Sequence, residues 1–173
     1  MELQLHLHHW ERREPDWSAA AVSGFAAGAV LMVLELLWAT FMSTMGPWRI
    51  SQLVAAFALG PDSLRSPVGS FSVLVVAVAL ATHYALGVVF GMVLGFISAG
   101  FHYDTGPGVL AMVGVVFGAL LYLFSFHVST QVFWWFAELR GWSTLAAHVI
   151  FGVTASLLYW KLARRRPGLP RSH

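Results

Sequence analysis

The feature that most constrains this chain is a set of four long apolar segments separated by short polar stretches. They cover about residues 18–43, 71–99, 108–136 and 143–163, and each is near or above the roughly 20 residues with which an α-helix crosses a bilayer. Only 10% of the 173 residues are charged, whereas soluble domains carry roughly 25%. The sequence therefore predicts an all-α integral membrane protein, a four-helix bundle in the lipid bilayer.

The segments between and around the predicted spans are short. Gly46 and Pro47 end the first span, and residues 48–59 are too short to cross a bilayer but apolar enough to lie on its surface, so we expect an interfacial helix there. Residues 1–17 form a polar N-terminal tail, and residues 164–173 form a basic C-terminal tail. No second domain is expected.

Basic residues follow the fourth span and indicate the orientation of the chain. By the positive-inside rule this tail is cytoplasmic, and four spans then place the N-terminus on the cytoplasmic side as well. The basic residues are Lys161, Arg164, Arg165, Arg166 and Arg171. The predicted outer face carries five tryptophans, as an aromatic belt does: Trp38, Trp48, Trp134, Trp135 and Trp142.

Several functional classes find no support in the sequence. The chain has no cysteine, which excludes disulfides, thiolate metal sites and cysteine nucleophiles. The net charge of +2 is small and sits mostly in one tail, so it does not indicate a nucleic-acid surface. No phosphate-binding loop, carboxylate pair or Ser-His-Asp arrangement with suitable spacing is present. These observations favour a protein that is not an enzyme.

A histidine followed four residues later by a glycine occurs in two of the predicted spans. His83 precedes Gly87, and His148 precedes Gly152, with the same separation of 65 positions (148 − 83). Ionisable residues inside a membrane are energetically expensive and are candidates for a functional site. The two histidines are therefore the first candidates to examine.

Glycine pairs at helical spacing extend this internal repeat. Gly24 and Gly28 in the first span recur as Gly114 and Gly118 in the third, 90 positions later (114 − 24), and Gly91 continues the series after Gly87. Small residues four apart allow helices to pack closely in lipid. The chain thus reads as two copies of one helical hairpin, related by a pseudo-two-fold axis along the membrane normal.

The repeat predicts which polar residues share one depth in the membrane. Glu35 lies seven residues after Gly28, nearly two helical turns, and its counterpart in the repeat is Ser125. We expect these two residues and both histidines inside the bundle, in the outer half of the membrane. His127 lies two and a half turns beyond Gly118 and is expected to point away from the bundle interior.

This polar cluster admits several chemical roles. The histidines can be structural and hydrogen-bond neighbouring helices. Alternatively, His83 and His148 can be the axial ligands of a haem b between the hairpins. A weaker alternative is a metal site formed by Glu35, His83 and His148. Proton or small-solute transfer is a further possibility.

Several segments resemble a family of small, uncharacterised bacterial inner-membrane proteins. The resemblance rests on residues 47–61, 120–126, 135–142, 148–152 and 158–159, and it covers nearly all of residues 20–160. Some members of that family carry the label sodium–proline symporter, although they are small for one. The resemblance implies four spans and an inner-membrane location, and it brings no known reaction. At His127 the family pattern is expected to have an aromatic residue such as Tyr.

Together these patterns favour a non-catalytic accessory subunit of a larger bacterial inner-membrane complex, with a respiratory or electron-transport complex as the most natural host. Its partners would then be the lipid bilayer and other membrane proteins. The first alternative is a haem-binding or metal-binding redox subunit that uses His83 and His148. The second is a small oligomeric transporter or channel in which Glu35 is the coupling site.

Overall fold

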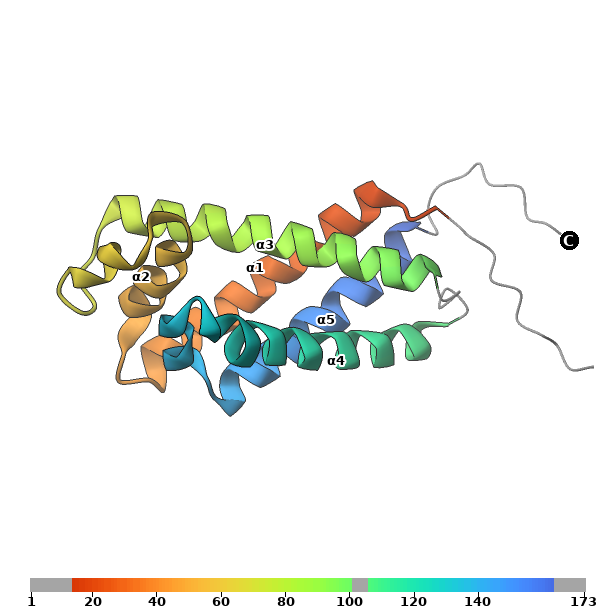
Figure 1. Ribbon diagram of the computed structural model, residues 1–173. Coiled ribbons are helices and arrows are strands. Elements are labelled where there is room, and N and C mark those ends of the chain that lie inside the picture. The colour runs from red at the N-terminus through yellow and green to blue at the C-terminus, as the bar shows by residue number, and fades with distance from the viewer. Residues whose placement is uncertain (1–13, 101–105, 164–173) are drawn as a thin grey trace, which may run out of the picture.

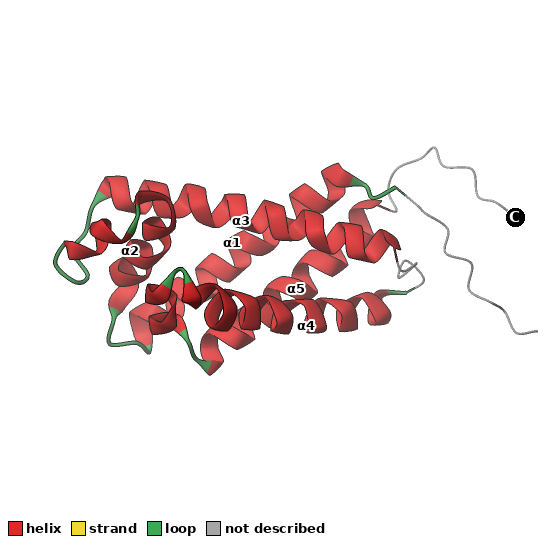
Figure 2. Cartoon of the chain, in the orientation of Figure 1, coloured by secondary structure: helices red, strands yellow, loops and turns green. Residues whose placement is uncertain are grey.

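The computed structural model describes residues 14–100 and 106–163. The expectations for most of the N-terminal tail and for the basic C-terminal tail lie outside these residues. Within the described ranges the regular structure is entirely helical, without any strand, as Figure 2 shows. This confirms the predicted all-α class.

Four long helices form the body of the molecule and shorter helical pieces cover one end (Figure 1). The long helices are α1 (Trp17–Phe41), α3 (Val73–Gly100), α4 (Pro107–Leu123) and α5 (Trp142–Ala163). The shorter pieces are α2 (Gly46–Leu59), η1 (Pro61–Arg65), η3 (Phe124–Val128), η4 (Ser129–Gln131) and η5 (Trp134–Leu139). The segment 48–59, predicted as an interfacial helix, is helical and belongs to α2.

Within the described residues, four helices are long and apolar enough to cross a membrane: Trp17–Phe41, Val73–Ala99, Pro107–Gln131 and Trp142–Ala163. The backbone N–H of Asp16 donates to the Tyr159 hydroxyl at 3.3 Å, so the start of α1 and the end of α5 lie at the same end of the bundle. The chain is thus a multi-pass membrane protein in which the first and last spans meet at one end.

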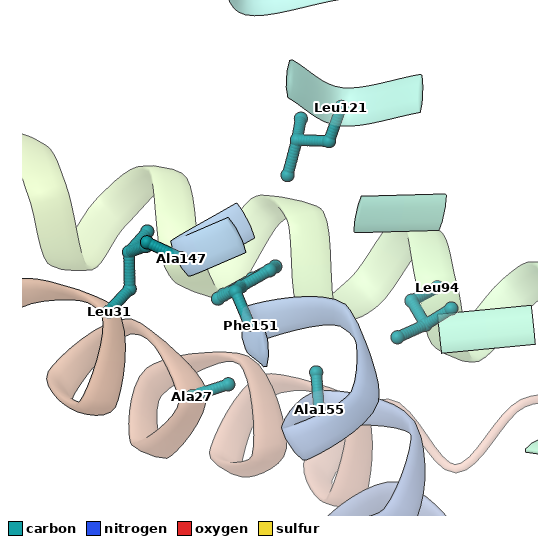
Figure 3. Packing of buried hydrophobic residues seen from close by; sticks show 7 residues of the cluster. All are labelled: Ala27, Leu31, Leu94, Leu121, Ala147, Phe151 and Ala155. Carbon is teal, nitrogen blue, oxygen red and sulfur yellow. The ribbon is translucent and has the colours of Figure 1, made fainter. Parts of the chain in front are cut away.

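The long helices pack in the order α3, α1, α5, α4, and the consecutive helices α3 and α4 contact each other little. A cluster of buried residues joins the two hairpins (Figure 3). Its members come from all four long helices: Ala27, Leu31, Leu94, Leu121, Ala147, Phe151 and Ala155. Phe151 of α5 is the largest fully buried side chain, and the small alanines let α1 and α5 approach each other closely.

The first helix begins one residue before the prediction, and Asp16 is its N-cap. The carboxylate of Asp16 accepts hydrogen bonds from the backbone N–H of Ala19 at 3.0 Å and from the hydroxyl of Ser18 at 2.8 Å. Ser18 is thus a residue of the first turn. A carboxylate is favoured here because the free N–H groups give the helix start a partial positive charge.

The third span ends as an α-helix earlier than predicted. The expected helix over residues 108–136 stops at Leu123 and continues as the π-helical η3 and the short η4. The Ser129 hydroxyl donates to the carbonyl of Ser125, and the Arg140 side chain donates to the carbonyl of Phe126. These side chains supply hydrogen-bond donors to two backbone carbonyls. The carbonyls therefore do not depend on the backbone N–H groups of a continuing α-helix.

The shorter pieces α2, η1 and η5 form what we call the cap, which covers the end of the bundle opposite the start of α1 (Figure 1). The Arg49 guanidinium in α2 contacts both carboxylate oxygens of Glu138 in η5, at 2.8 and 3.0 Å. The Trp135 indole donates to the carbonyl of Leu53 at 3.1 Å. Trp135 is only 4% exposed, so it belongs to the cap interior and not to the aromatic belt predicted for it.

Gln52 fixes the chain after η1 to α2. Its side-chain amide donates to the carbonyl of Pro67 at 3.1 Å, and its side-chain oxygen accepts from the N–H of Gly69 at 3.3 Å. The side chain is 2% exposed and is satisfied by these bonds. The cap is therefore held together by polar contacts with defined partners, in addition to its apolar packing.

Candidate functional site

The glycines of the first hairpin form its closest helix contact. A Cβ atom at Gly24 would lie 2.7 Å from the Cα of Gly91 and even closer to the carbonyl oxygen of Gly87. Such distances leave no room for a side chain. The α1 and α3 backbones therefore touch where the repeated glycines occur, as their spacing predicts.

The second hairpin repeats this contact with the predicted offsets. A Cβ atom at Gly114 would lie 2.7 Å from the carbonyl carbon of Gly152 and 2.5 Å from the hydroxyl oxygen of Ser156. A Cβ atom at Gly118 would lie 2.7 Å from the Cα of Val149. Gly114 corresponds to Gly24 and Gly152 to Gly87, so the two hairpins have equivalent contact faces.

The two histidines differ in their hydrogen bonds despite the repeat. The Nε2 of His83 lies 2.8 Å from the carbonyl oxygen of Gly28, so it joins α3 to α1. The Nδ1 of His148 lies 2.8 Å from the carbonyl oxygen of Thr144, one turn earlier in the same helix. Because a carbonyl oxygen only accepts, each of these ring nitrogens carries a hydrogen. One histidine thus links helices and the other stays within its own helix.

Aromatic rings surround His148 on the side of α4. The ring centroid of Phe126 lies 5.3 Å from that of His148, and the ring centroid of Tyr122 lies 6.2 Å away. His148 is 7% exposed. This packing fixes its ring at the wall of the bundle interior.

Both histidines line one cavity beneath the cap, which we call the central cavity. It has a volume of about 100 Å³, and Glu35 and Ser125 also line it. The four polar residues that the repeat places at one depth are therefore brought together. The cap contributes Val54, Phe136 and Leu139 to the wall of this cavity.

Glu35 lies where three cavities meet. Besides the central cavity, it lines a cavity of about 100 Å³ against α3, which Trp48 and His83 also line, and one of about 230 Å³ against α5, which Ile50 and Thr144 also line. We call these the α3-side cavity and the α5-side cavity. Among the polar side chains that line them, only that of Glu35 borders all three.

Among the residues that the structure describes, no hydrogen bond or ion pair reaches the Glu35 carboxylate. The cationic side chain of Arg49 in the cap is paired with Glu138 at 2.8 Å. A carboxylate in an apolar setting is unfavourable unless it binds a proton or a positive charge. The chemistry that this arrangement supports best is thus the reversible binding of a proton or a cation.

The predicted metal site is not formed. No group of three His, Asp or Glu side chains in residues 14–100 and 106–163 lies close enough together to hold a metal ion. Glu35, His83 and His148 share the central cavity but not the short distances that metal ligands need.

The arrangement does not fit a haem between His83 and His148 either. Pockets for drug-sized ligands occupy roughly 300–1,000 Å³, and a haem is at least as large as such ligands, whereas the central cavity is about 100 Å³. The Nε2 of His83 is already engaged with Gly28. We therefore assign no redox cofactor to the two histidines.

His127 lies outside the site. It is exposed in η3, where its ring contacts that of Tyr122 with centroids 5.6 Å apart. The cap residues that line the cavities, such as Ile50 and Val54 on α2, were not predicted from the sequence. Polar residues in 48–59 occur only at positions 49, 51 and 52, and this pattern predicts a buried apolar face but not what it covers.

The fold and site define a class of protein. It is a four-helix, multi-pass membrane protein built from two similar hairpins, with a cavity beneath a cap that ionisable side chains line. Comparison with protein-family models, curated proteins and solved structures gave no match.

Proposed function

We propose that this chain is a small membrane transport protein in which Glu35 carries a proton or a cation. The observation that carries the proposal is the position of Glu35, without a polar partner among the described residues, at the junction of three cavities. An ionisable group that serves only to hold helices together has a partner, as His83 has in Gly28. Glu35 is instead available to a ligand.

The proposed orientation places the capped end on the outer side of a bacterial inner membrane. The support is the run of arginines after α5, which by the positive-inside rule belongs on the cytoplasmic side. Glu35 then lies in the outer half of the membrane beneath the cap. Because α2 and η5 line the cavities, movement of the cap is the simplest route by which the outer aqueous phase would reach Glu35.

An accessory subunit of a larger membrane complex is the second candidate. It is favoured by exposed apolar side chains near the cap, where Trp142 is 86% exposed, Val132 71% and Trp134 61%. This role predicts that a partner membrane protein co-purifies under mild detergent. Transport is the leading proposal because an accessory role offers no reason for a carboxylate at the meeting point of three cavities.

Reconstitution into liposomes tests the leading proposal. The full chain is inserted into vesicles that contain a pH-sensitive dye, and proton entry is followed after a potential is imposed. We expect flux from the wild-type chain and none above protein-free vesicles from Glu35→Gln, since the amide cannot carry the charge. Wild-type flux in Glu35→Gln would contradict the proposal.

A matched control uses a carboxylate outside the cavities. Asp62 in η1 is paired with Arg65 at 3.1 Å, and its side chain is 82% exposed. Asp62→Asn removes one acidic charge from the capped end without touching Glu35. Its flux should equal that of the wild-type chain, which separates the role of Glu35 from a general effect of surface charge.

A further inference from the structure

The lining of the central cavity is mostly aromatic and aliphatic, with one acidic side chain. Four phenyl rings contribute to it: Phe90, Phe126, Phe136 and Phe151. The ring centroids of Phe126 and Phe136 are 6.2 Å apart, and these two rings come from η3 and η5. The faces of such rings attract cations, most strongly where water is excluded.

We propose that the central cavity binds a small organic ammonium ion, with its charge at Glu35 and its carbon atoms against the phenyl rings. The inference rests on the proposed function, because it names the cation that Glu35 would carry. It also assigns a role to Phe126 and Phe136, which helix packing alone leaves without a specific function.

The oxygen atoms of the lining are too few for a hard inorganic cation. Such ions are held by about six or more oxygen ligands or keep much of their water. The Gly28 carbonyl already accepts from His83, and the Ser125 carbonyl accepts from Ser129. The Glu35 carboxylate and the Ser125 hydroxyl remain as side-chain oxygen ligands for a cation. A strongly hydrated ion would lose its water here without adequate replacement, whereas a methylated ammonium ion is only weakly hydrated.

The cavity volume limits the size of the ligand. About 100 Å³ is less than the roughly 150 Å³ of an engineered apolar cavity that binds benzene. A single nitrogen with a few methyl groups is on this scale, and a drug-sized aromatic cation is too large. The proposed class is therefore methylated ammonium ions, for which tetramethylammonium is a suitable probe.

Binding is measured by isothermal titration of tetramethylammonium chloride into the full chain in detergent at constant ionic strength. We expect saturable binding to the wild-type chain, no detectable binding to Glu35→Gln, and no displacement by an equal concentration of sodium or potassium. No binding to the wild-type chain, unchanged binding to Glu35→Gln, or displacement by sodium would each overturn the inference.

A second pair of variants tests the aromatic contribution without removing the charge. Phe136→Leu keeps an apolar side chain at the cavity wall but removes the ring face, so the dissociation constant should rise about tenfold. Phe96→Leu on α3 is the control, because Phe96 is 62% exposed and lines none of the three cavities. Equal affinities in the two variants would contradict a cation–aromatic site. Gel filtration of both establishes that each is folded.

The binding experiments and the flux experiment test the two proposals independently. If Glu35-dependent proton flux occurs without tetramethylammonium binding, the proposal of an organic-cation ligand is refuted and the transport proposal is retained. Glu35-dependent binding without flux of protons or of tetramethylammonium would leave the binding site standing and remove transport.

Discussion

The imidazole of His83 donates a 2.8 Å hydrogen bond to the carbonyl oxygen of Gly28, across the glycine contact between α1 and α3. The bond is possible because the contact between Gly24 and Gly91 brings the backbones of α1 and α3 close together. His148, the counterpart of His83 in the repeat, bonds within its own helix instead. The two hairpins therefore share a glycine contact but differ in how the histidine stabilises it.

Replacing His83 should weaken the first hairpin. Loss of one hydrogen bond between membrane helices costs about 0.6–1.7 kcal/mol, so we expect His83→Leu to lower the free energy of unfolding by about 1 kcal/mol. His127→Leu is the control, because His127 is exposed and its change should stay within about 0.5 kcal/mol. Both values come from reversible unfolding in detergent micelles. Equal stability of the two variants would show that the Gly28 bond contributes nothing.

The two glycines of α1 should respond differently to alanine. A Cβ atom at Gly24 would clash with the backbone of Gly91 at 2.7 Å, whereas at Gly28 the nearest atom, the Cα of Gly87, is 3.7 Å away. Gly24→Ala should therefore lower the free energy of unfolding by about 1–3 kcal/mol. Gly28→Ala should be neutral or raise it by up to about 1 kcal/mol, since alanine favours helix. A reversed order would refute this contact between α1 and α3.

This difference between Gly24 and Gly28 illustrates what the sequence could predict. Periodicity and spacing predicted four helices, the glycine faces and the meeting of Glu35 and Ser125 with both histidines, because each depends only on helical geometry and on the repeat. Spacing alone treats the two glycines of α1 as equivalent. Only the separation of the two helix axes at each level distinguishes them.

Other features depend on contacts that are distant in sequence. Trp135 is buried because its indole reaches the carbonyl of Leu53, 82 residues away, and hydropathy places it with the exposed tryptophans. The break in α4 depends on Arg140 reaching back to Phe126. Likewise, nothing in residues 48–59 reveals that α2 covers Glu35. Such pairings between segments cannot be read from local composition.

The ion pair between Arg49 and Glu138 should keep the cap closed over the cavities. The two side chains are 11% and 36% exposed and form a two-pronged contact, worth about 1 kcal/mol. Since the chain has no cysteine, Val54→Cys on the cavity-facing side of α2 gives a single reporter. Adding Arg49→Gln should make a water-soluble maleimide label this cysteine about fivefold faster, because loss of about 1 kcal/mol favours the open cap.

Two controls define this result. Arg65→Gln breaks an ion pair whose side chains are 85% and 82% exposed and which lies outside the cavities, so the labelling of Val54→Cys should not change. Exchanging the charges, as Arg49→Glu with Glu138→Arg, should restore slow labelling because the attraction is restored. If the exchanged pair labels as fast as Arg49→Gln, the ion pair is not what closes the cap.

Moving the carboxylate to its symmetric position should preserve ligand binding. Ser125 is the counterpart of Glu35 in the repeat, and both line the central cavity, but Glu35 alone lines the α3-side and α5-side cavities. The double variant Glu35→Ser with Ser125→Glu therefore places the charge in the central cavity and removes it from the other two. We expect it to bind tetramethylammonium within about tenfold of the wild-type affinity, because the same rings surround the ligand.

The same variant separates binding from transport. If ions reach the central cavity through the α3-side or α5-side cavity, the double variant should bind tetramethylammonium but carry no proton flux in liposomes, since neither route then contains a carboxylate. Glu35→Ser alone should lose both activities. If the double variant binds no better than Glu35→Ser, Ser125 and Glu35 do not face one ligand, and the shared cavity is not the binding site.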